Sequence, residues 1–144
     1  MKLNHIGIVV YEIAVFANLF KMLGFKDVTD PEPDPIQKVR ACFVTIDNIF
    51  PIHIELLEPI QEDSPISNFL KKRGGGLHHL CFEVNDIDKV VEDLNRNGFK
   101  IISPPVECIG YDKSFRLNNA QPTKIAFFLL SDKFLLELLQ NGSP

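Results

Sequence analysis

The sequence is poor in cysteine, in excess positive charge and in long apolar runs. Its three cysteines, Cys42, Cys81 and Cys108, lack the spacing of a metal-binding motif, so we expect free, reduced thiols in a cytoplasmic protein. The formal net charge of −4 offers no basic surface to a nucleic acid or an anionic membrane. No apolar run reaches the roughly 18 residues that a membrane-spanning helix needs, and no leader pattern opens the chain. We therefore expect no membrane span and no signal peptide.

The chain has the composition of an ordinary globular protein. It contains 144 residues, of which 45% are hydrophobic and 24% are charged. A chain of this length can bury a substantial core, so we expect one domain that spans residues 1–144.

An internal repeat organises the sequence. LNHIGIVV at residues 3–10 aligns with LHHLCFEV at 77–84, an offset of 74, and seven of the first 24 ungapped positions are identical. Further along, ELL at 55–57 matches ELL at 137–139, an offset of 82. The growth in the offset indicates a longer connection in the second copy, which we place at 107–123. We interpret the chain as two copies of one unit.

Hydrophobic periodicity predicts the order strand, helix, strand, strand, strand in each copy. In the first copy we expect strands at 3–10, 25–29, 37–46 and 52–58 and a helix at 14–23. In the second copy we expect strands at 77–84, 99–103, 124–130 and 133–140 and a helix at 87–97 behind an N-cap at Asp86. The first module then covers about residues 1–60 and the second about 75–144.

A linker helix is predicted between the modules, at about residues 64–73. Ser64 and Pro65 suit its N-cap and first position, and the glycines at 74–76 suit its end. Lys71, Lys72 and Arg73 lie in its last turn, where cations complement the helix dipole. Phosphate binding is the alternative role for these three residues.

Strand alternation separates the two neighbouring histidines of the second copy. Successive side chains in a strand point to opposite faces, so only one of His78 and His79 is expected to face a given site. Leu80 and Phe82 mark the face that packs on helices, with His78 at its edge. His79 is placed on the opposite, concave face, as the repeat partner of His5.

Two glutamates share this pattern. Glu55 and Glu137 are repeat partners within apolar strands, where an unpaired carboxylate is costly and needs a cation, a metal or a hydrogen bond. With His5 and His79 they could converge as four nitrogen and oxygen ligands for one divalent ion such as Zn, Co, Ni, Mn or Fe. A single strand histidine or glutamate is more often a packed or ion-paired residue, and the joint occurrence at repeat-equivalent positions favours the metal site. We expect two further residues on the same face, His53 and Glu83, to take no part in the site.

The sequence resembles the vicinal oxygen chelate superfamily, which includes glyoxalases, bleomycin resistance proteins and dioxygenases, and within it most closely the methylmalonyl-CoA epimerase subgroup. The resemblance rests on the runs LNHIGIVV, QKVRACFV, IELLEP, SPISNFLKKRGGGLHHLCFEVNDI and LLELLQ. It implies an α+β fold in which two βαβββ modules form a cupped eight-stranded mixed sheet with helices on the outside. It also implies the metal ligands His5, Glu55, His79 and Glu137.

The resemblance further implies a metal-dependent epimerase or isomerase that acts by α-proton transfer on a small acyl thioester, such as an acyl-CoA. The metal would polarise the acyl carbonyl, with Glu137 as the base and Glu55 as its partner across the metal. A homodimer is compatible with the repeat, because such modules can be exchanged between protomers. The sequence departs from the subgroup at Ala41 and at loops 112–123 and 130–133, so the substrate does not follow from the resemblance.

Three other functions are compatible with this family to different degrees. A glyoxalase I-type lyase would use the same ligands on a glutathione hemithioacetal. A non-catalytic small-molecule binding protein of the resistance type would bind a ligand without exchanging any of its protons with solvent. An extradiol dioxygenase is disfavoured by Glu55, because such iron sites use two histidines and one carboxylate and keep positions open for oxygen.

Overall fold

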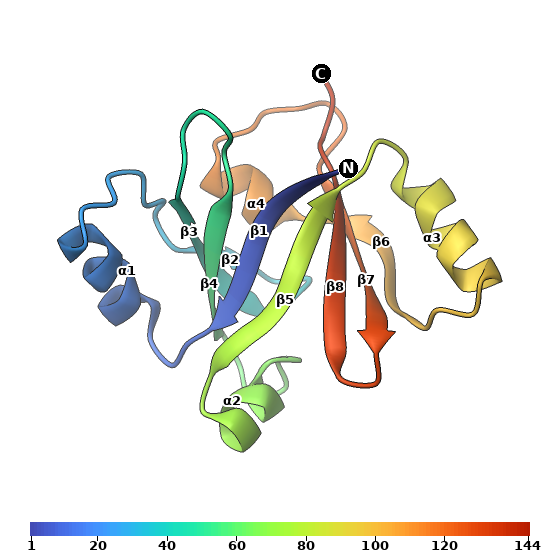
Figure 1. The fold of residues 1–144 in the computed structure, drawn as a ribbon. Coiled ribbons are helices and arrows are strands. Elements are labelled where there is room, and N and C mark those ends of the chain that lie inside the picture. The colour runs from blue at the N-terminus through green and yellow to red at the C-terminus, as the bar shows by residue number, and fades with distance from the viewer.

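A computed structural model describes all residues 1–144, and Figure 1 shows its single curled sheet with helices around it. The first half contains β1 (Lys2–Val9), α1 (Ile13–Met22), β2 (Glu32–Asp34), β3 (Val39–Thr45), β4 (His53–Pro59) and α2 (Ser67–Arg73). The second half contains β5 (Gly76–Glu83), α3 (Ile87–Arg96), β6 (Ile101–Glu107), α4 (Ile109–Ser114), β7 (Lys124–Ser131) and β8 (Phe134–Gln140). None of these helices is both long and apolar enough to cross a membrane.

The eight strands form one mixed sheet in the order β2-β3-β4-β1-β5-β8-β7-β6. Each repeat contributes four adjacent strands, and the repeats meet where β1 pairs with β5 in antiparallel fashion. The pairs β1–β4 and β5–β8 are parallel, whereas the outer pairs are antiparallel. The predicted α+β architecture of two βαβββ units in one cupped eight-stranded sheet is confirmed.

Hydrophobic packing differs on the two faces of the sheet. On the outer face α1 buries Ile13 and Ala17 against the first repeat, and α3 buries Ile87 against the second. The concave face has its own core, in which Val9 and Leu139 are almost fully buried. Because α1 and α3 cover only the outer face (Figure 1), the concave face is left for a site.

The ends of the helices follow local chemistry, with one difference from prediction. Asp86 caps α3 by accepting a hydrogen bond from the backbone N–H of Lys89, and Gly74 ends α2 with a left-handed φ of 72°. The predicted start of α2 at Ser64 was wrong. The N–H of Ser67 bonds to the carbonyl of Ser64 and closes a turn, and the first helical bond runs from Leu70 to Ile66.

Two segments differ from their predicted structure. The strand expected at 25–29 is only an isolated bridge between Val28 and Val44, and the pairing continues as β2 three residues beyond the predicted range. Pro31, which has no N–H to donate, interrupts the ladder between the two. The long connection expected at 107–123 contains the unpredicted helix α4, and β6 extends beyond its predicted end. The remaining helices and strands lie within two residues of their predicted ranges.

Candidate metal centre

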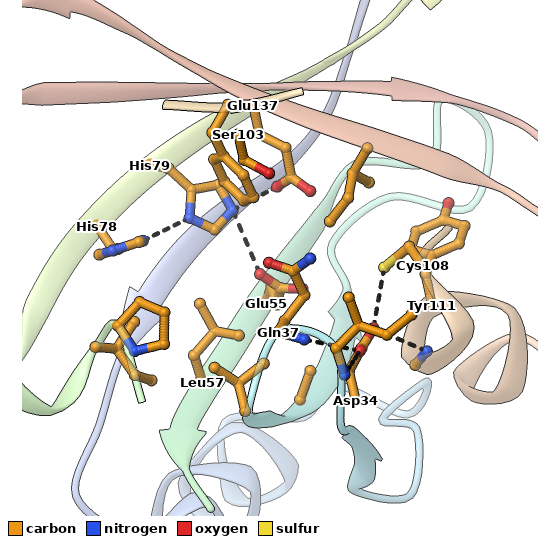
Figure 2. Close-up of a pocket in the computed structure, with 18 of the residues that line it drawn as sticks. Asp34, Gln37, Glu55, Leu57, His78, His79, Ser103, Cys108, Tyr111 and Glu137 are labelled. Carbon is orange, nitrogen blue, oxygen red and sulfur yellow. Dashed lines mark hydrogen bonds and ion pairs between the residues drawn. The ribbon is translucent and has the colours of Figure 1, made fainter. Parts of the chain in front are cut away.

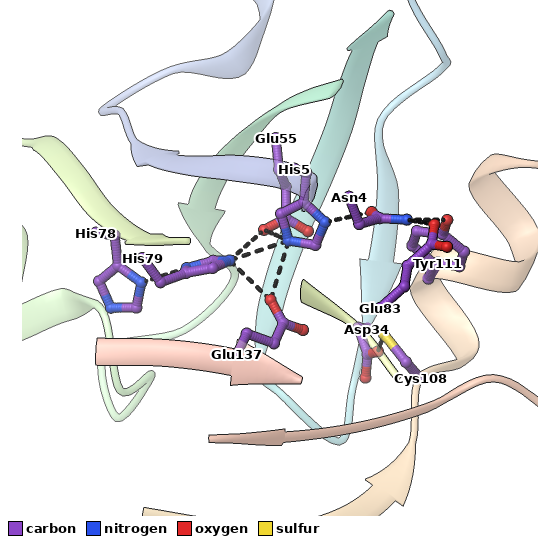
Figure 3. A network of polar contacts seen from close by, with 10 residues as sticks. All are labelled: Asn4, His5, Asp34, Glu55, His78, His79, Glu83, Cys108, Tyr111 and Glu137. Atoms are coloured by element: carbon purple, nitrogen blue, oxygen red, sulfur yellow. Dashed lines mark hydrogen bonds and ion pairs between the residues drawn. The ribbon is translucent and has the colours of Figure 1, made fainter. Parts of the chain in front are cut away.

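Four side chains converge on the concave face, one from each of the four central strands. They are His5 on β1, Glu55 on β4, His79 on β5 and Glu137 on β8, and one potential ligand atom of each lies within 4.8 Å of those of the other three. Figure 3 shows the two imidazoles and two carboxylates directed at a common point. The four side chains predicted from the repeat are therefore brought together by the structure.

Strand register explains this convergence. Across the sheet, Gly7 of β1 lies between Glu55 and His79, and Cys81 of β5 lies between His5 and Glu137. In each row a small residue therefore separates the carboxylate from the histidine. The ring of His79 occupies the space that a side chain at Gly7 would fill, since an added Cβ would lie 2.2–2.6 Å from three of its ring atoms.

Distances between the donor atoms match those around a small divalent ion. The Nε2 atoms of His5 and His79 are 3.1 Å apart, and Oε2 of Glu137 lies 2.9 Å and 2.8 Å from them. Oε1 of Glu55 lies 3.6 Å and 3.4 Å from the same two nitrogens. Ligand atoms about 2.1 Å from a tetrahedral ion are about 3.4 Å from one another, and two imidazoles with two carboxylates are suitable donors. The residues fit a divalent metal.

A second pair of residues holds the rings of the two histidines. Oδ1 of Asn4 lies 2.7 Å from Nδ1 of His5, and Nδ1 of His78 lies 2.8 Å from Nδ1 of His79. Both contacts leave the Nε2 atoms directed at the cluster. Asn4 in turn donates hydrogen bonds to Glu83 and to the hydroxyl of Tyr111, as Figure 3 shows. Such outer partners fix the tautomer and orientation of ligating histidines.

Two strand irregularities determine where the side chains of Asn4 and His78 lie. They also show that the predicted direction of the His78 side chain was wrong. The β1–β5 register slips between Leu3 and His5, and again where Gly7 and Ile8 face His79 and Leu77. The residues skipped on the two strands are Asn4 and His78, which are repeat partners. Because a bulge re-aims the side chain of its extra residue, His78 also lines the cavity in front of His79. Strict alternation would have directed it to the helix-packed face.

Burial and mutual charge dominate the electrostatics of the cluster. Burial opposes protonation of His79, but the charges of Glu137 and Glu55 outweigh it and raise the pKa of His79 to about 10. Burial likewise opposes ionisation of Glu137, and the two histidines overcome it and hold its pKa below the usual value. Burial, reinforced by the nearby charge of His79, lowers the pKa of His78 to about 3. His78 is therefore neutral at physiological pH, and its Nδ1 can accept a hydrogen bond.

A cavity of about 520 Å³ opens in front of the cluster. Figure 2 shows Glu55, His79 and Glu137 on one side of it and Asp34, Cys108 and Tyr111 on another. Most of its lining is apolar, and no lysine or arginine contributes to it. A carboxylate in such surroundings is poorly hydrated, which strengthens electrostatic interactions with a bound substrate.

Helix α4 forms one wall of this cavity. The buried carboxylate of Asp34 accepts hydrogen bonds from the backbone N–H groups of Ile36 and Gln37 at the end of β2 and of Gly110 in α4. Gly110 suits this close approach, since an added Cβ would lie 2.9 Å from Cβ of Asp34. The cavity is lined in α4 by Gly110 and Tyr111, directly before the loop 112–123 that departs from the epimerase pattern, and Ala41 also lines it.

The two residues that were expected to take no part in the site, His53 and Glu83, lie outside the cluster of four and have different contacts. His53 is buried against Thr45, 3.1 Å from its hydroxyl, and burial lowers its pKa to about 4. Glu83 contacts the cluster indirectly, because it accepts the hydrogen bond of Asn4. Sequence reasoning did not single out Asn4 or Tyr111. The position of Asn4 directly before His5, matching His78 before His79, was the available signal.

Replacing Gly7 with alanine is expected to displace the ring of His79 and weaken metal binding by about tenfold or more. The new methyl group would occupy the position of the ring, as described above. Titration with Co(II), followed by visible absorption, measures the change. Cys81→Ala is the matched control, because it removes an atom at the repeat-equivalent position and should leave the affinity near that of the wild type. An unchanged affinity in Gly7→Ala would contradict the packing argument.

Comparison with known proteins identifies the family and the fold of the chain. The family model for the glyoxalase/bleomycin resistance protein/dioxygenase superfamily matches residues 4–109. The mitochondrial methylmalonyl-CoA epimerase of Dictyostelium discoideum is 39% identical over 104 residues, which are 72% of this chain and 61% of that protein. The ethylmalonyl-CoA/methylmalonyl-CoA epimerase of Cereibacter sphaeroides is 34% identical over 110 residues, 76% of this chain and 80% of the relative.

A solved structure shares the fold over almost the whole chain. The methylmalonyl-CoA epimerase of Streptomyces coelicolor, in complex with 2-nitronate-propionyl-CoA, superimposes with a TM-score of 0.81 at 24% identity and covers 98% of this chain and 97% of its own. The chain spans about three fifths of the length of the mitochondrial relative quoted above. From the matched family model, the relatives and the fold, the chain belongs to the glyoxalase/bleomycin resistance protein/dioxygenase superfamily, where its relatives include methylmalonyl-CoA epimerases.

Proposed function

We propose that the protein is a metal-dependent epimerase that inverts the α-carbon of a malonyl-type acyl-CoA thioester, with methylmalonyl-CoA as the first candidate substrate. The observation that carries this proposal is the pair of repeat-related carboxylates, Glu55 and Glu137, which lie against the same two imidazoles at the base of an apolar cavity. The relatives named as epimerases support the proposal. Inversion of a carbon needs two such groups, one to remove the proton and one to return it from the other face.

His5, Glu55, His79 and Glu137 would hold the metal in this proposal. When bound, the ion would polarise the thioester carbonyl and stabilise the negative charge that develops on its oxygen. The hydrogen bonds of Asn4 and His78 keep the two Nε2 atoms available as ligands. The cluster gains further rigidity because each ligand comes from a different paired strand of the sheet.

Glu137 is the proposed base. Its Oε2 contacts both imidazoles, whereas no hydrogen bond occupies its Oε1. Oε1 can therefore take the α-proton while the other oxygen stays in place. Glu55 has the same arrangement, since only its Oε1 lies near the imidazoles. The cycle starts with Glu137 ionised and with Glu55 carrying a proton on its second oxygen. Glu137 takes the α-proton and Glu55 delivers its own proton to the opposite face, which leaves Glu137 protonated and Glu55 ionised. Water then takes the proton from Glu137 and returns one to Glu55.

This proton cycle provides the test of the proposal. In D₂O, the enzyme loaded with Co(II) or Zn(II) is expected to introduce deuterium at C2 of methylmalonyl-CoA, observed by NMR, much faster than the chelator-treated protein. Absence of metal-dependent deuterium incorporation in protein with demonstrated bound metal would overturn the proposal. A glutathione hemithioacetal would then be the next substrate to assay, because the superfamily includes glyoxalases.

A further inference from the structure

A second hollow, of about 240 Å³, adjoins the cavity of the metal centre. The two share His78 and Leu135 as lining residues, so the hollow begins where the cavity opens beside the start of β5. Its walls are the last turn of α2, with Lys72 and Arg73, and the turn between β7 and β8, with Lys133. Figure 1 shows α2 and the β7–β8 hairpin at the same end of the sheet, where β5 begins.

The hollow is cationic in a chain that is acidic overall. Lys72, Arg73 and Lys133 contribute to its lining, and no aspartate or glutamate does. None of the three forms an ion pair with a carboxylate. Three unpaired cations in one depression repel one another, so their placement together favours an anionic ligand.

The dipole of α2 explains only part of this arrangement. Cations in the last turn of a helix are stabilised by its carbonyl groups, which accounts for Lys72 and Arg73. Arg73 is also held over the ring of Phe69, 5.2 Å from its centroid. Lys133 comes from a different part of the chain, 60 residues beyond Arg73, and the short β7–β8 turn brings it to the same hollow. The dipole of α2 therefore does not explain the position of Lys133.

We propose that Lys72, Arg73 and Lys133 bind the phosphate groups of the nucleotide tail of an acyl-CoA, while its acyl end occupies the adjoining cavity. This inference rests on the proposed function and names the part of the substrate that the metal centre does not contact. The cavity has no lysine or arginine among its lining residues, so the phosphates need a separate site. Ammonium and guanidinium groups are the usual partners of phosphate oxygens.

Another polar hollow, of about 380 Å³, is less suited to phosphates. Its cations Lys26, Lys113 and Arg116 are matched by three acidic residues, Asp27, Asp30 and Glu32. It also shares no lining residue with the cavity. Of these two polar hollows, only the one beside β5 combines positive charge without compensating acids with contact to the cavity. This hollow of mixed charge therefore supplies the residues for the control variant of the binding experiment.

The test is calorimetric titration of the metal-loaded protein with free CoA and with pantetheine, which lacks the nucleotide and its phosphates. Lys72→Ala/Lys133→Ala is expected to weaken CoA binding by about tenfold or more and to leave pantetheine binding unchanged. The matched control, Lys26→Ala/Lys113→Ala, removes the same charge from the other hollow and should bind CoA like the wild type. The wild-type affinity for CoA should also fall with added salt.

Equal CoA affinity in the wild type and in Lys72→Ala/Lys133→Ala would overturn the phosphate site, as would an equal loss in both double variants. Binding is measured without turnover, so the result does not depend on whether the protein epimerises its substrate. If CoA binds through these lysines and no deuterium enters methylmalonyl-CoA, the phosphate site stands and the epimerase proposal fails. If deuterium enters and the lysine substitutions do not change CoA binding, the epimerase proposal stands and the phosphate site fails.

Discussion

Glu137→Gln is expected to reduce metal-dependent deuterium incorporation at C2 of methylmalonyl-CoA by about 10²- to 10⁴-fold, the usual contribution of a general base. The amide is nearly the same size as the carboxylate and can still accept a hydrogen bond through its oxygen, but it cannot take the α-proton. Glu137 is almost fully buried, with an exposed fraction of 4%, so a water molecule cannot readily act as the base in its place while substrate fills the cavity. Incorporation of deuterium is measured by NMR together with the metal content of the variant.

Metal content separates the two roles of Glu137. A variant that keeps its metal and loses the exchange supports the base, whereas normal exchange would remove Glu137 from the mechanism. Glu107→Gln is the control, because it makes the same chemical change on an exposed strand position that lines neither hollow nor cavity. It should leave both metal content and exchange unchanged.

His79→Ala is expected to lose most of its affinity for Co(II) or Zn(II), and His78→Ala to lose about 10- to 100-fold. The first substitution removes a nitrogen that lies within 3.4 Å of the other three donor atoms. The second removes only the partner of that ring. When Nε2 of His79 serves as a ligand, its Nδ1–H donates to the neutral Nδ1 of His78, which holds the ring in place.

Competition with a chelator of known affinity measures both losses. His53→Ala is the matched control: this histidine is also buried on the concave face, but its partner is Thr45 and it is not part of the cluster. Its metal affinity should equal that of the wild type. If His78→Ala lost the metal and His79→Ala kept it, the assignment of ligands on β5 would be wrong. If His78→Ala were unaffected, the His78–His79 contact would have no role in metal binding.

Much of the fold could be predicted because its signals are local and occur twice. Apolar alternation marked seven of the eight strands, and Asp86 and Gly74 mark a helix start and a helix end by their own backbone and side-chain chemistry. Repeat-equivalent residues occupy equivalent positions in space, so the convergence of Glu55 with Glu137 followed without knowledge of any long-range contact. Local signals failed around Pro31, because the strand expected at 25–29 is only a bridge at Val28 and β2 begins at Glu32.

The sequence by itself determined the two βαβββ units and the four side chains that meet on the concave face. Hydrophobic period, capping residues and the internal repeat can be read from the sequence alone. They predict the structure correctly because the apolar faces that they define are the faces that the folded chain buries. Only the tertiary structure decided that His78 and Asn4 turn towards the histidines that follow them. A bulge depends on how two strands that are far apart in the sequence align their hydrogen bonds, and no periodicity within one strand records that alignment. The same holds for α4 against Asp34 and for Lys133 beside Arg73, since distant segments create each contact and the cavity and hollow exist only between them.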